Sequence, residues 1–191
     1  MKIFKLTISA FFLAFTFSNQ ATAAGLIVDL NVNYQTDNDN VQTYKYGTTI
    51  AQAFLGASIT KSGKLFFGQN VCSFSRTYTT AGVSYSFSTL ELGPRISYYF
   101  DGAKTWLFTA IWNPFAEGTR TDNSVVDEIK GSSMEFGLGY QIKLSKKVSL
   151  GVMMTYHALS ITKVVDAAKA ETTVSSTYTS IYPMLSLSMR F

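Results

Sequence analysis

Residues 26–35 read Leu-Ile-Val-Asp-Leu-Asn-Val-Asn-Tyr-Gln, an alternation of apolar and polar side chains. A period of two is typical of a β-strand that has one apolar and one polar face. A helix would instead bring Asp29 and Asn33 into its apolar stripe. The stretch is about ten residues long, which is the length that a tilted strand needs to cross a bilayer.

The same alternation returns along the chain and predicts eight strands in all. Further apolar faces are predicted within residues 49–59, 83–100, 106–112, 134–144, 148–158 and 179–191. The strand over 65–78 alternates too ambiguously for its faces to be assigned. Short turns are predicted at 60–64, 101–104 and 145–147. Longer loops are predicted at 36–43, 113–131 and 162–176, with a shorter connection near 79–82.

An even number of strands, with short turns on one edge and longer loops on the other, is the pattern of outer-membrane barrels. A sheet must also close on itself in lipid, because an open edge would leave backbone groups unpaired. The expected fold is therefore all-β, an eight-stranded antiparallel transmembrane β-barrel with short periplasmic turns and longer extracellular loops.

The polar face separates a membrane barrel from a soluble one. A soluble barrel turns its apolar face inward, whereas a membrane barrel turns it toward lipid. Apolar faces this broad would make the protein aggregate in water, so the membrane orientation is expected. A lumen of eight strands has room only for side chains, which predicts a polar network inside. Its candidate members are Asp29, Glu91, Arg95, Glu135, Lys143, His157 and Arg190.

The first residues have the features of a secretory signal peptide. Lys2 and Lys5 precede an apolar run over 6–17, and small residues follow at 21–24. The apolar run is too short to cross a bilayer as a helix. We expect residues 1–23 to be removed, with cleavage after Ala24 as the alternative, so that 24–191 form one barrel domain. Export to the bacterial outer membrane follows.

Three segments carry a family resemblance. They are the terminal strand 180–191, which ends on Phe191, the stretch Leu-Gly-Pro-Arg-Ile-Ser-Tyr-Tyr-Phe at 92–100, and Phe-Gly-Leu-Gly-Tyr at 136–140. In these the chain resembles the small outer-membrane β-barrel proteins, the OmpA/OmpX/OmpW-like superfamily, over essentially all of 24–191. The resemblance implies that Phe191 belongs to a C-terminal signal read by the barrel-assembly machinery. That machinery and outer-membrane lipid are the expected partners.

Composition argues against several kinds of chemistry. His157 is the single histidine and Cys72 the single cysteine, which excludes a multi-histidine metal site and an intrachain disulfide. We expect no metal and no cofactor. Without Lys2 and Lys5 the chain holds 14 basic and 12 acidic residues. No basic stripe of the kind that binds nucleic acid is present, so no nucleic-acid partner is expected.

Three functions stay open. The first is a non-enzymatic role, structural or in surface interaction, with an extracellular ligand bound through 113–131 and 162–176. The second is a narrow channel or an OmpW-like conduit for small or apolar solutes, although the lumen charges favour a plug of ion pairs over a gate.

The third function is a lipid A-modifying enzyme. His157, Ser160 and Glu171 are close in sequence, but a strand places His157 and Ser160 on opposite faces. A catalytic pair needs to be within hydrogen-bond reach. We therefore expect no enzyme activity.

Overall fold

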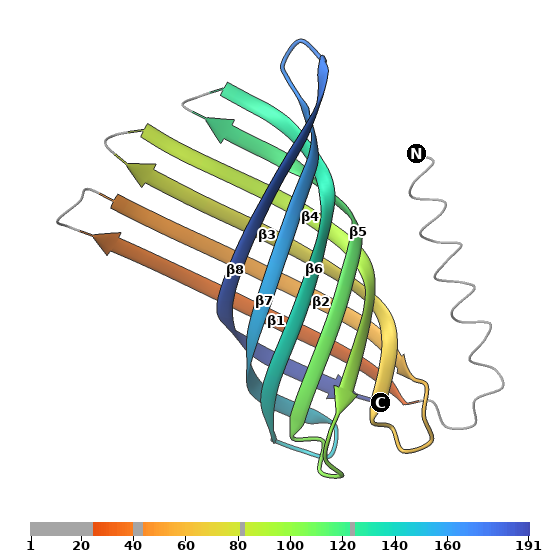
Figure 1. The fold of residues 1–191 in the computed structure, drawn as a ribbon. Coiled ribbons are helices and arrows are strands. Elements are labelled where there is room, and N and C mark those ends of the chain that lie inside the picture. The colour runs from red at the N-terminus through yellow and green to blue at the C-terminus, as the bar shows by residue number, and fades with distance from the viewer. Residues whose placement is uncertain (1–24, 40–43, 81–82, 123–124) are drawn as a thin grey trace.

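The computed structural model describes residues 25–39, 44–80, 83–122 and 125–191. The predicted signal peptide, residues 1–23, lies outside the described residues. Within those ranges the chain forms eight strands in a closed antiparallel barrel, in sequence order (Figure 1). They are β1 (Leu26–Asp39), β2 (Tyr44–Ser58), β3 (Leu65–Thr80), β4 (Val83–Tyr99), β5 (Trp106–Asp122), β6 (Val125–Lys143), β7 (Val148–Val165) and β8 (Glu171–Arg190). The predicted all-β, eight-stranded antiparallel fold is confirmed. In the same ranges no helix has the length and hydropathy of a membrane span.

The short turns lie at one end of the barrel, which we call the turn end, and the opposite end is the hairpin end. The predicted turns at 60–64, 101–104 and 145–147 all separate strands in the structure. Gly63 adopts a φ of 62°, a conformation that glycine takes without steric cost. The Asp101 carboxylate accepts hydrogen bonds from the backbone N–H groups of Thr105 and Trp106, at 2.8 and 3.1 Å. These bonds fix the second turn.

The hairpin end differs from the prediction. The β5–β6 ladder continues to the pair Asp122–Val125, and the β7–β8 ladder continues to Val165–Glu171. The loops predicted at 113–131 and 162–176 are therefore wrong, because most of each segment is strand. The β5–β6 ladder shifts register between Asn113 and Ala116, and the β7–β8 ladder shifts register between Ile161 and Lys163. Such bulges break the period of two while the pairing continues.

Barrel closure is uneven along β8. The β7–β8 ladder extends from Val148–Met189 to Val165–Glu171, whereas the described β1–β8 ladder covers only Ile27–Arg190 to Val32–Leu185. Beyond that ladder, the β7–β8 hairpin and the strands β1–β4 diverge toward the hairpin end (Figure 1). The barrel wall is thus continuous at the turn end and parted at the hairpin end.

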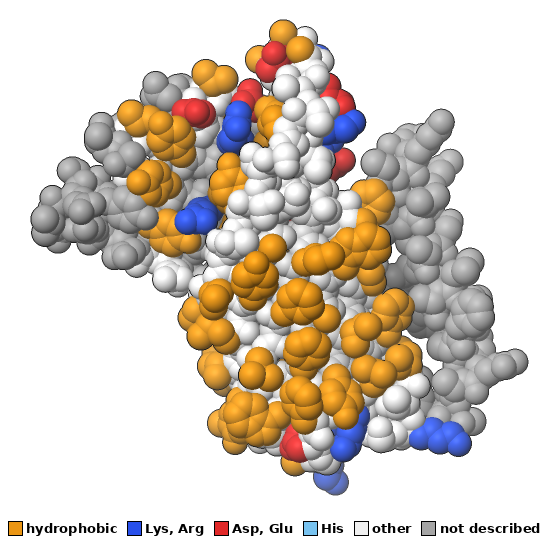
Figure 2. All heavy atoms as spheres, in the orientation of Figure 1, with side chains coloured by type: hydrophobic (Ala, Val, Ile, Leu, Met, Phe, Trp, Pro, Cys, Tyr) orange, Lys and Arg blue, Asp and Glu red, His pale blue; other side chains and the backbone are white. Residues whose placement is uncertain are grey.

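Apolar side chains cover the outside of the barrel. Leu30, Trp112, Leu138, Val152 and Leu185 are each exposed by 41% or more. Figure 2 shows hydrophobic side chains gathered over the turn-end half of the barrel, below a largely polar stretch that leads to the β7–β8 hairpin. The outward faces predicted by parity for seven strands are those observed.

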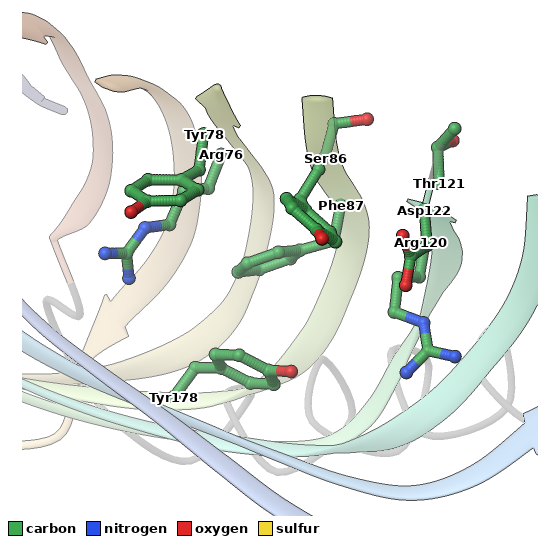
Figure 3. A pocket seen from close by; sticks show the side chains of 9 residues that line it. Arg76, Tyr78, Ser86, Phe87, Arg120, Thr121, Asp122 and Tyr178 are labelled. Carbon is green, nitrogen blue, oxygen red and sulfur yellow. The ribbon is translucent and has the colours of Figure 1, made fainter. Parts of the chain in front are cut away.

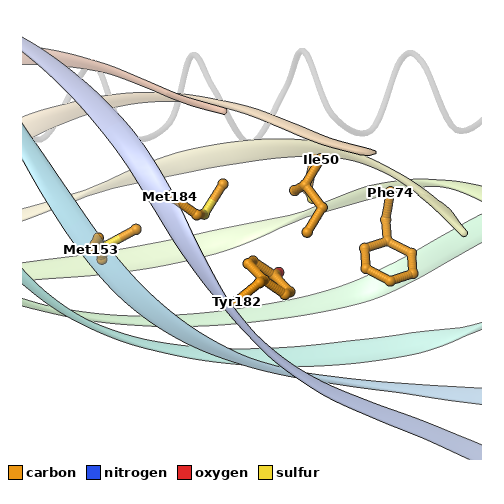
Figure 4. Packing of buried hydrophobic residues seen from close by; sticks show 6 residues of the cluster. Ile50, Phe74, Met153, Tyr182 and Met184 are labelled. Carbon is orange, nitrogen blue, oxygen red and sulfur yellow. The ribbon is translucent and has the colours of Figure 1, made fainter. Parts of the chain in front are cut away.

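The third strand, whose faces the sequence left unassigned, turns Cys72 and Phe74 inward and Val71 outward. Its alternation is ambiguous because the lumen holds apolar residues as well. Three apolar clusters fill the lumen in layers from the turn end to the hairpin end. They are Ile27, Phe54, Phe66, Tyr99 and Leu107; then Ile50, Cys72, Phe74, Met153, Tyr182 and Met184 (Figure 4); then Ala116, Ile129, Leu159 and Ile161.

Candidate functional site in the barrel lumen

Asp29 of β1 and Arg95 of β4 form an ion pair inside the barrel. The Arg95 Nη2 atom lies 2.7 Å from Asp29 Oδ2, and both side chains are 0% exposed. Arg95 Nε also donates to Ser97 Oγ at 2.9 Å, and the guanidinium lies 4.4 Å from the centre of the Phe54 ring. Because β1 and β4 are not neighbours in the sheet, this pair spans the lumen.

Glu91 of β4 is the centre of a second group. Its Oε1 atom accepts from Thr89 Oγ1 at 2.7 Å, and its Oε2 atom accepts from Ser133 Oγ. The same Oε2 lies 3.0 Å from His157 Nε2 of β7. The His157 ring is stacked against Phe74, with 4.6 Å between ring centroids. These bonds join β4 to β6 and β7 through the interior.

Glu135 of β6 lies beside Glu91. It accepts from Gln52 Nε2 of β2, on a strand that is not adjacent to β6, and from Asn113 Nδ2 at 3.3 Å. The same Asn113 nitrogen is 3.4 Å from Glu91 Oε2. Both carboxylates are 0% exposed. Two acidic side chains therefore share one donor in a region that water does not reach.

Cys72 completes this group. It pairs in register with Gln52 on one side and with Glu91 on the other. The Cys72 sulfur and one carboxylate oxygen each from Glu91 and Glu135 all lie within 4.8 Å of one another. The sequence alone does not reveal this association, because the ambiguous alternation of the third strand assigns Cys72 to neither face. The inward parity of Gln52 and Glu91, its neighbours in the ladder, is the signal that could have found it.

Arg190 closes the turn end of the lumen. Its Nη2 atom donates to Gln141 Oε1 at 3.0 Å, and its guanidinium lies 4.6 Å from the centre of the Tyr99 ring. Gln141 Nε2 in turn donates to Ser188 Oγ at 2.7 Å. Lys143, a predicted member of the network, is instead exposed. It occupies the last ladder position of β6, where the inward face already meets solvent.

Phe191 lies at the seam between the first and last strands. Its backbone N–H donates to Leu26 O at 2.9 Å, and its carbonyl oxygen accepts from the Leu26 N–H at 3.0 Å. The phenyl ring is 64% exposed on the outside of the barrel. A recognition signal for assembly, implied by the resemblance, remains a prediction for this residue.

A cavity of about 430 Å³ opens at the hairpin end (Figure 3). Arg76 on one wall lies 4.7 Å from the centre of the Tyr46 ring, and Arg120 on another is paired with Asp127 at 2.9 Å. Phe87 and Tyr178 line the cavity between them, with 5.1 Å between ring centroids. Its walls come from β3, β4, β5 and β8, and Arg120, Thr121 and Asp122 belong to a segment that was predicted as a loop.

The residues considered for catalysis lie apart. His157 is buried in the lumen, whereas Ser160 lies on the opposite face of β7. Glu171, at the start of β8, forms an exposed ion pair with Lys163. The structure therefore does not bring these three side chains together.

No protein-family model matches this sequence, and no curated protein matches it. Among solved structures, the chain is similar to the translocator domain of autotransporter NalP from Neisseria meningitidis. The TM-score is 0.43 and the sequence identity 8%, with 96% of this chain and 68% of that chain covered. At these values the likeness supports no conclusion about family or function.

Proposed function

We propose that this chain is an integral protein of the bacterial outer membrane, with its apolar exterior in contact with lipid. The observation that carries the proposal is that the barrel is polar inside and apolar outside, the reverse of a soluble barrel. Charged side chains such as Asp29, Arg95 and Glu135 are fully buried inside, while large apolar side chains cover the outside. Lipid-facing barrels have this arrangement, and a soluble barrel would expose a large apolar surface to water.

Aromatic residues at the turn end fit an interfacial position. Trp106 and Tyr140 pack edge to face with 5.1 Å between ring centroids, and Tyr98 and Phe100 do so at 5.3 Å. All four rings are at least 38% exposed. Aromatic girdles at the membrane–water boundary are a feature of transmembrane barrels, so these rings support a boundary close to the turn end.

Trp106 and Trp112 are the only tryptophans in the sequence, and both point outward from β5. We expect acyl-chain bromination of the host lipid to quench their fluorescence strongly in the reconstituted barrel. The variants Trp106→Phe and Trp112→Phe isolate each signal. Trp112 should respond to bromine deeper in the bilayer than Trp106. Quenching by aqueous iodide, with no effect of brominated lipid, would contradict the proposal.

The proposed role is non-enzymatic, structural or in surface interaction. Bonds across the lumen support it, because Asp29–Arg95 and Gln52–Glu135 each join strands that are not neighbours and so block the interior. The cavity at the hairpin end supports surface interaction, since about 430 Å³ lies within the size range of small-ligand sites. On this proposal the hairpins carry the binding surface and the barrel holds them in place.

The hairpins can be tested in cells that lack the chain. Cells without the chain should lose either the ability of the outer membrane to exclude a large dye or adhesion to a surface. The full-length protein should restore whichever of the two is lost. The variant Arg76→Ala/Tyr178→Ala removes two side chains that line the cavity, leaves the turn end unchanged, and separates the two roles. A structural role predicts full rescue by the variant, and surface interaction predicts loss of adhesion alone. An unchanged phenotype without the chain would contradict both.

A sideways conduit for small apolar solutes is the second candidate. The specific observation in its favour is the short described β1–β8 ladder, which ends at Val32–Leu185. Next to its end, the Asn33 side chain donates to the carbonyl of Pro183, so a side chain replaces the regular ladder there. Uptake of an apolar dye into proteoliposomes tests it, and uptake equal to that of empty liposomes would exclude it.

A further inference from the structure

The two charged groups of the lumen differ in their balance of charge. Asp29 and Arg95 form a pair of opposite charges. Glu91 and Glu135 are both acidic, and among the described residues the one side chain hydrogen-bonded to either of them that can become a cation is His157, at Glu91 Oε2. With a neutral imidazole and both carboxyl groups ionised, the second group would carry two negative charges out of reach of water. An uncompensated buried charge is strongly unfavourable unless a proton or a metal cation neutralises it.

The geometry of the group suits a metal cation. Cys72, Glu91 and Glu135 come from β3, β4 and β6, and their sulfur and oxygen atoms lie within 4.8 Å of one another. Two ligands of one zinc ion, each about 2.0–2.3 Å from the metal, are less than about 4.6 Å apart. A small rotation of side chains would therefore bring all three onto one ion.

A buried hydroxyl points into the same group independently. Tyr182 is 1% exposed, and its hydroxyl faces Glu135, Cys72 and Glu91. The hydroxyl lies close enough to Glu135 to interact with that carboxylate, but among the described residues it has no hydrogen-bond partner of normal geometry. Figure 4 shows its ring projecting into the lumen between Met184 and Phe74. A polar atom left unpaired in a barrel interior indicates a missing partner.

We propose that Cys72, Glu91 and Glu135 bind a divalent transition-metal cation of the zinc type, with the Tyr182 hydroxyl completing the site. A thiolate together with carboxylates suits a borderline cation such as Zn²⁺ better than Ca²⁺ or Mg²⁺. On binding, which takes place as the barrel folds, the Cys72 thiol releases its proton to water, because the thiolate is the form that ligates a metal. Two carboxylates, a thiolate and a dication then sum to one negative charge, whereas the same three ligands without the metal would carry three.

His157 would be a positioning residue in this site. Its Nε2 atom holds Glu91 at 3.0 Å, and side chains behind metal ligands orient them in this way. All three ligands are buried, so the cation would enter as the barrel folds. A closed site of this kind stabilises a fold rather than performing catalysis.

The test uses residues 24–191, the expected barrel domain, refolded into liposomes with Zn²⁺ or with Co²⁺ as the spectroscopic substitute. The wild type should retain one equivalent of metal after removal of free ions, and the cobalt form should show a thiolate-to-cobalt charge-transfer band. Cys72→Ser and Glu135→Gln should each lower metal affinity at least about tenfold, by analogy with losses at other metal sites. Met184→Leu, in the same apolar cluster, is the control and should bind as the wild type does.

The shift in gel mobility on boiling reports separately whether each variant forms a barrel. Folded wild type with no more zinc than folded Cys72→Ser would overturn the proposal, as would a cobalt form without the thiolate band. If the two variants fail to fold, the proposal is tested on the wild type alone. Zinc retained by the untreated protein is then compared with zinc retained by protein whose Cys72 was alkylated before refolding. Equal metal in those two samples would also overturn it.

Discussion

Two ion pairs with nearly the same geometry lie in opposite surroundings. The Arg95–Asp29 pair in the lumen and the Lys169–Glu128 pair at the hairpin end have N–O separations of 2.7 and 2.6 Å. The side chains of the first pair are 0% exposed, and those of the second are 72% and 52% exposed. Water screens the second pair, and holding its two exposed side chains in one geometry costs entropy. Removing either partner of the first pair would leave the other as an uncompensated buried charge. The burial of an ion pair, more than its N–O distance, sets how much stability is lost when one partner is removed.

The same contrast separates the two halves of the barrel. At the turn end the ladder is closed around a packed interior, and polar side chains bond across it. At the hairpin end the strands part around an open cavity, and the described ion pairs there join exposed or partly exposed groups. The first half therefore carries most of the stability, and the second is free to present a surface.

The largest expected effect is that of Arg95→Met. It removes the charge but keeps a long apolar stem, so Asp29 stays buried without its partner. We expect the free energy of unfolding to fall by about 3–5 kcal/mol, measured by urea titration of the barrel in liposomes. The double variant Asp29→Asn/Arg95→Met should recover a large part of this loss. Equal loss in the single and double variants would show that the charge pair is not the cause.

A smaller effect is expected at Gly93. A Cβ atom there would collide with the backbone of Trp112 and Asn113 on β5, which cannot move as a side chain can. We expect Gly93→Ala to lower the free energy of unfolding by about 1–3 kcal/mol. Gly47→Ala, toward the hairpin end, meets nothing within 4 Å and is the matched control. Equal losses at the two positions would show that the collision with the β5 backbone is not the cause of the loss at Gly93.

The smallest effect is expected for Lys169→Ala. The hydrogen bond and charge of Lys169 lower the pKa of Glu128 from its ordinary value of 4.5. The contribution of this pair is therefore present above 4.5 and is lost as the pH falls through the lowered pKa. We expect no resolvable change in unfolding at neutral pH, and a return of the Glu128 pKa toward 4.5 in a carboxyl NMR titration. A clear loss of stability at pH 7 would remove the distinction between the two pairs.

Parity in the sequence predicted the wall of the barrel well. Side chains that alternate along a strand must point to opposite faces, so the inward positions of Asp29, Glu91 and Arg95 followed from counting. The tight turns followed from short polar stretches between two alternating runs. These features are local, and the sequence states them directly.

Other features depend on partners that are distant in the chain. Whether Gln52 meets Glu135 depends on the shear of the closed barrel, which no single strand encodes. Cys72 was left without a face because Phe66 and Phe67, like Val71 and Cys72, place apolar residues on both sides of β3. The bulges at 113–116 and 161–163 shifted the alternation and made paired strands look like loops. Parity also placed Lys143 on the inward face without showing that the lumen ends there.

We propose that bonds across the lumen block the passage of ions through the barrel, and conductance in a planar bilayer tests this most directly. The purified wild type should insert without steady stepwise current at any holding potential that the bilayer tolerates. Replacing Gln52 and Glu135 together by alanine removes one crossing bond and should produce at most brief, irregular openings. Steady discrete openings of the wild type that disappear in Glu91→Gln would contradict the claim, because they would show that the network forms a gate.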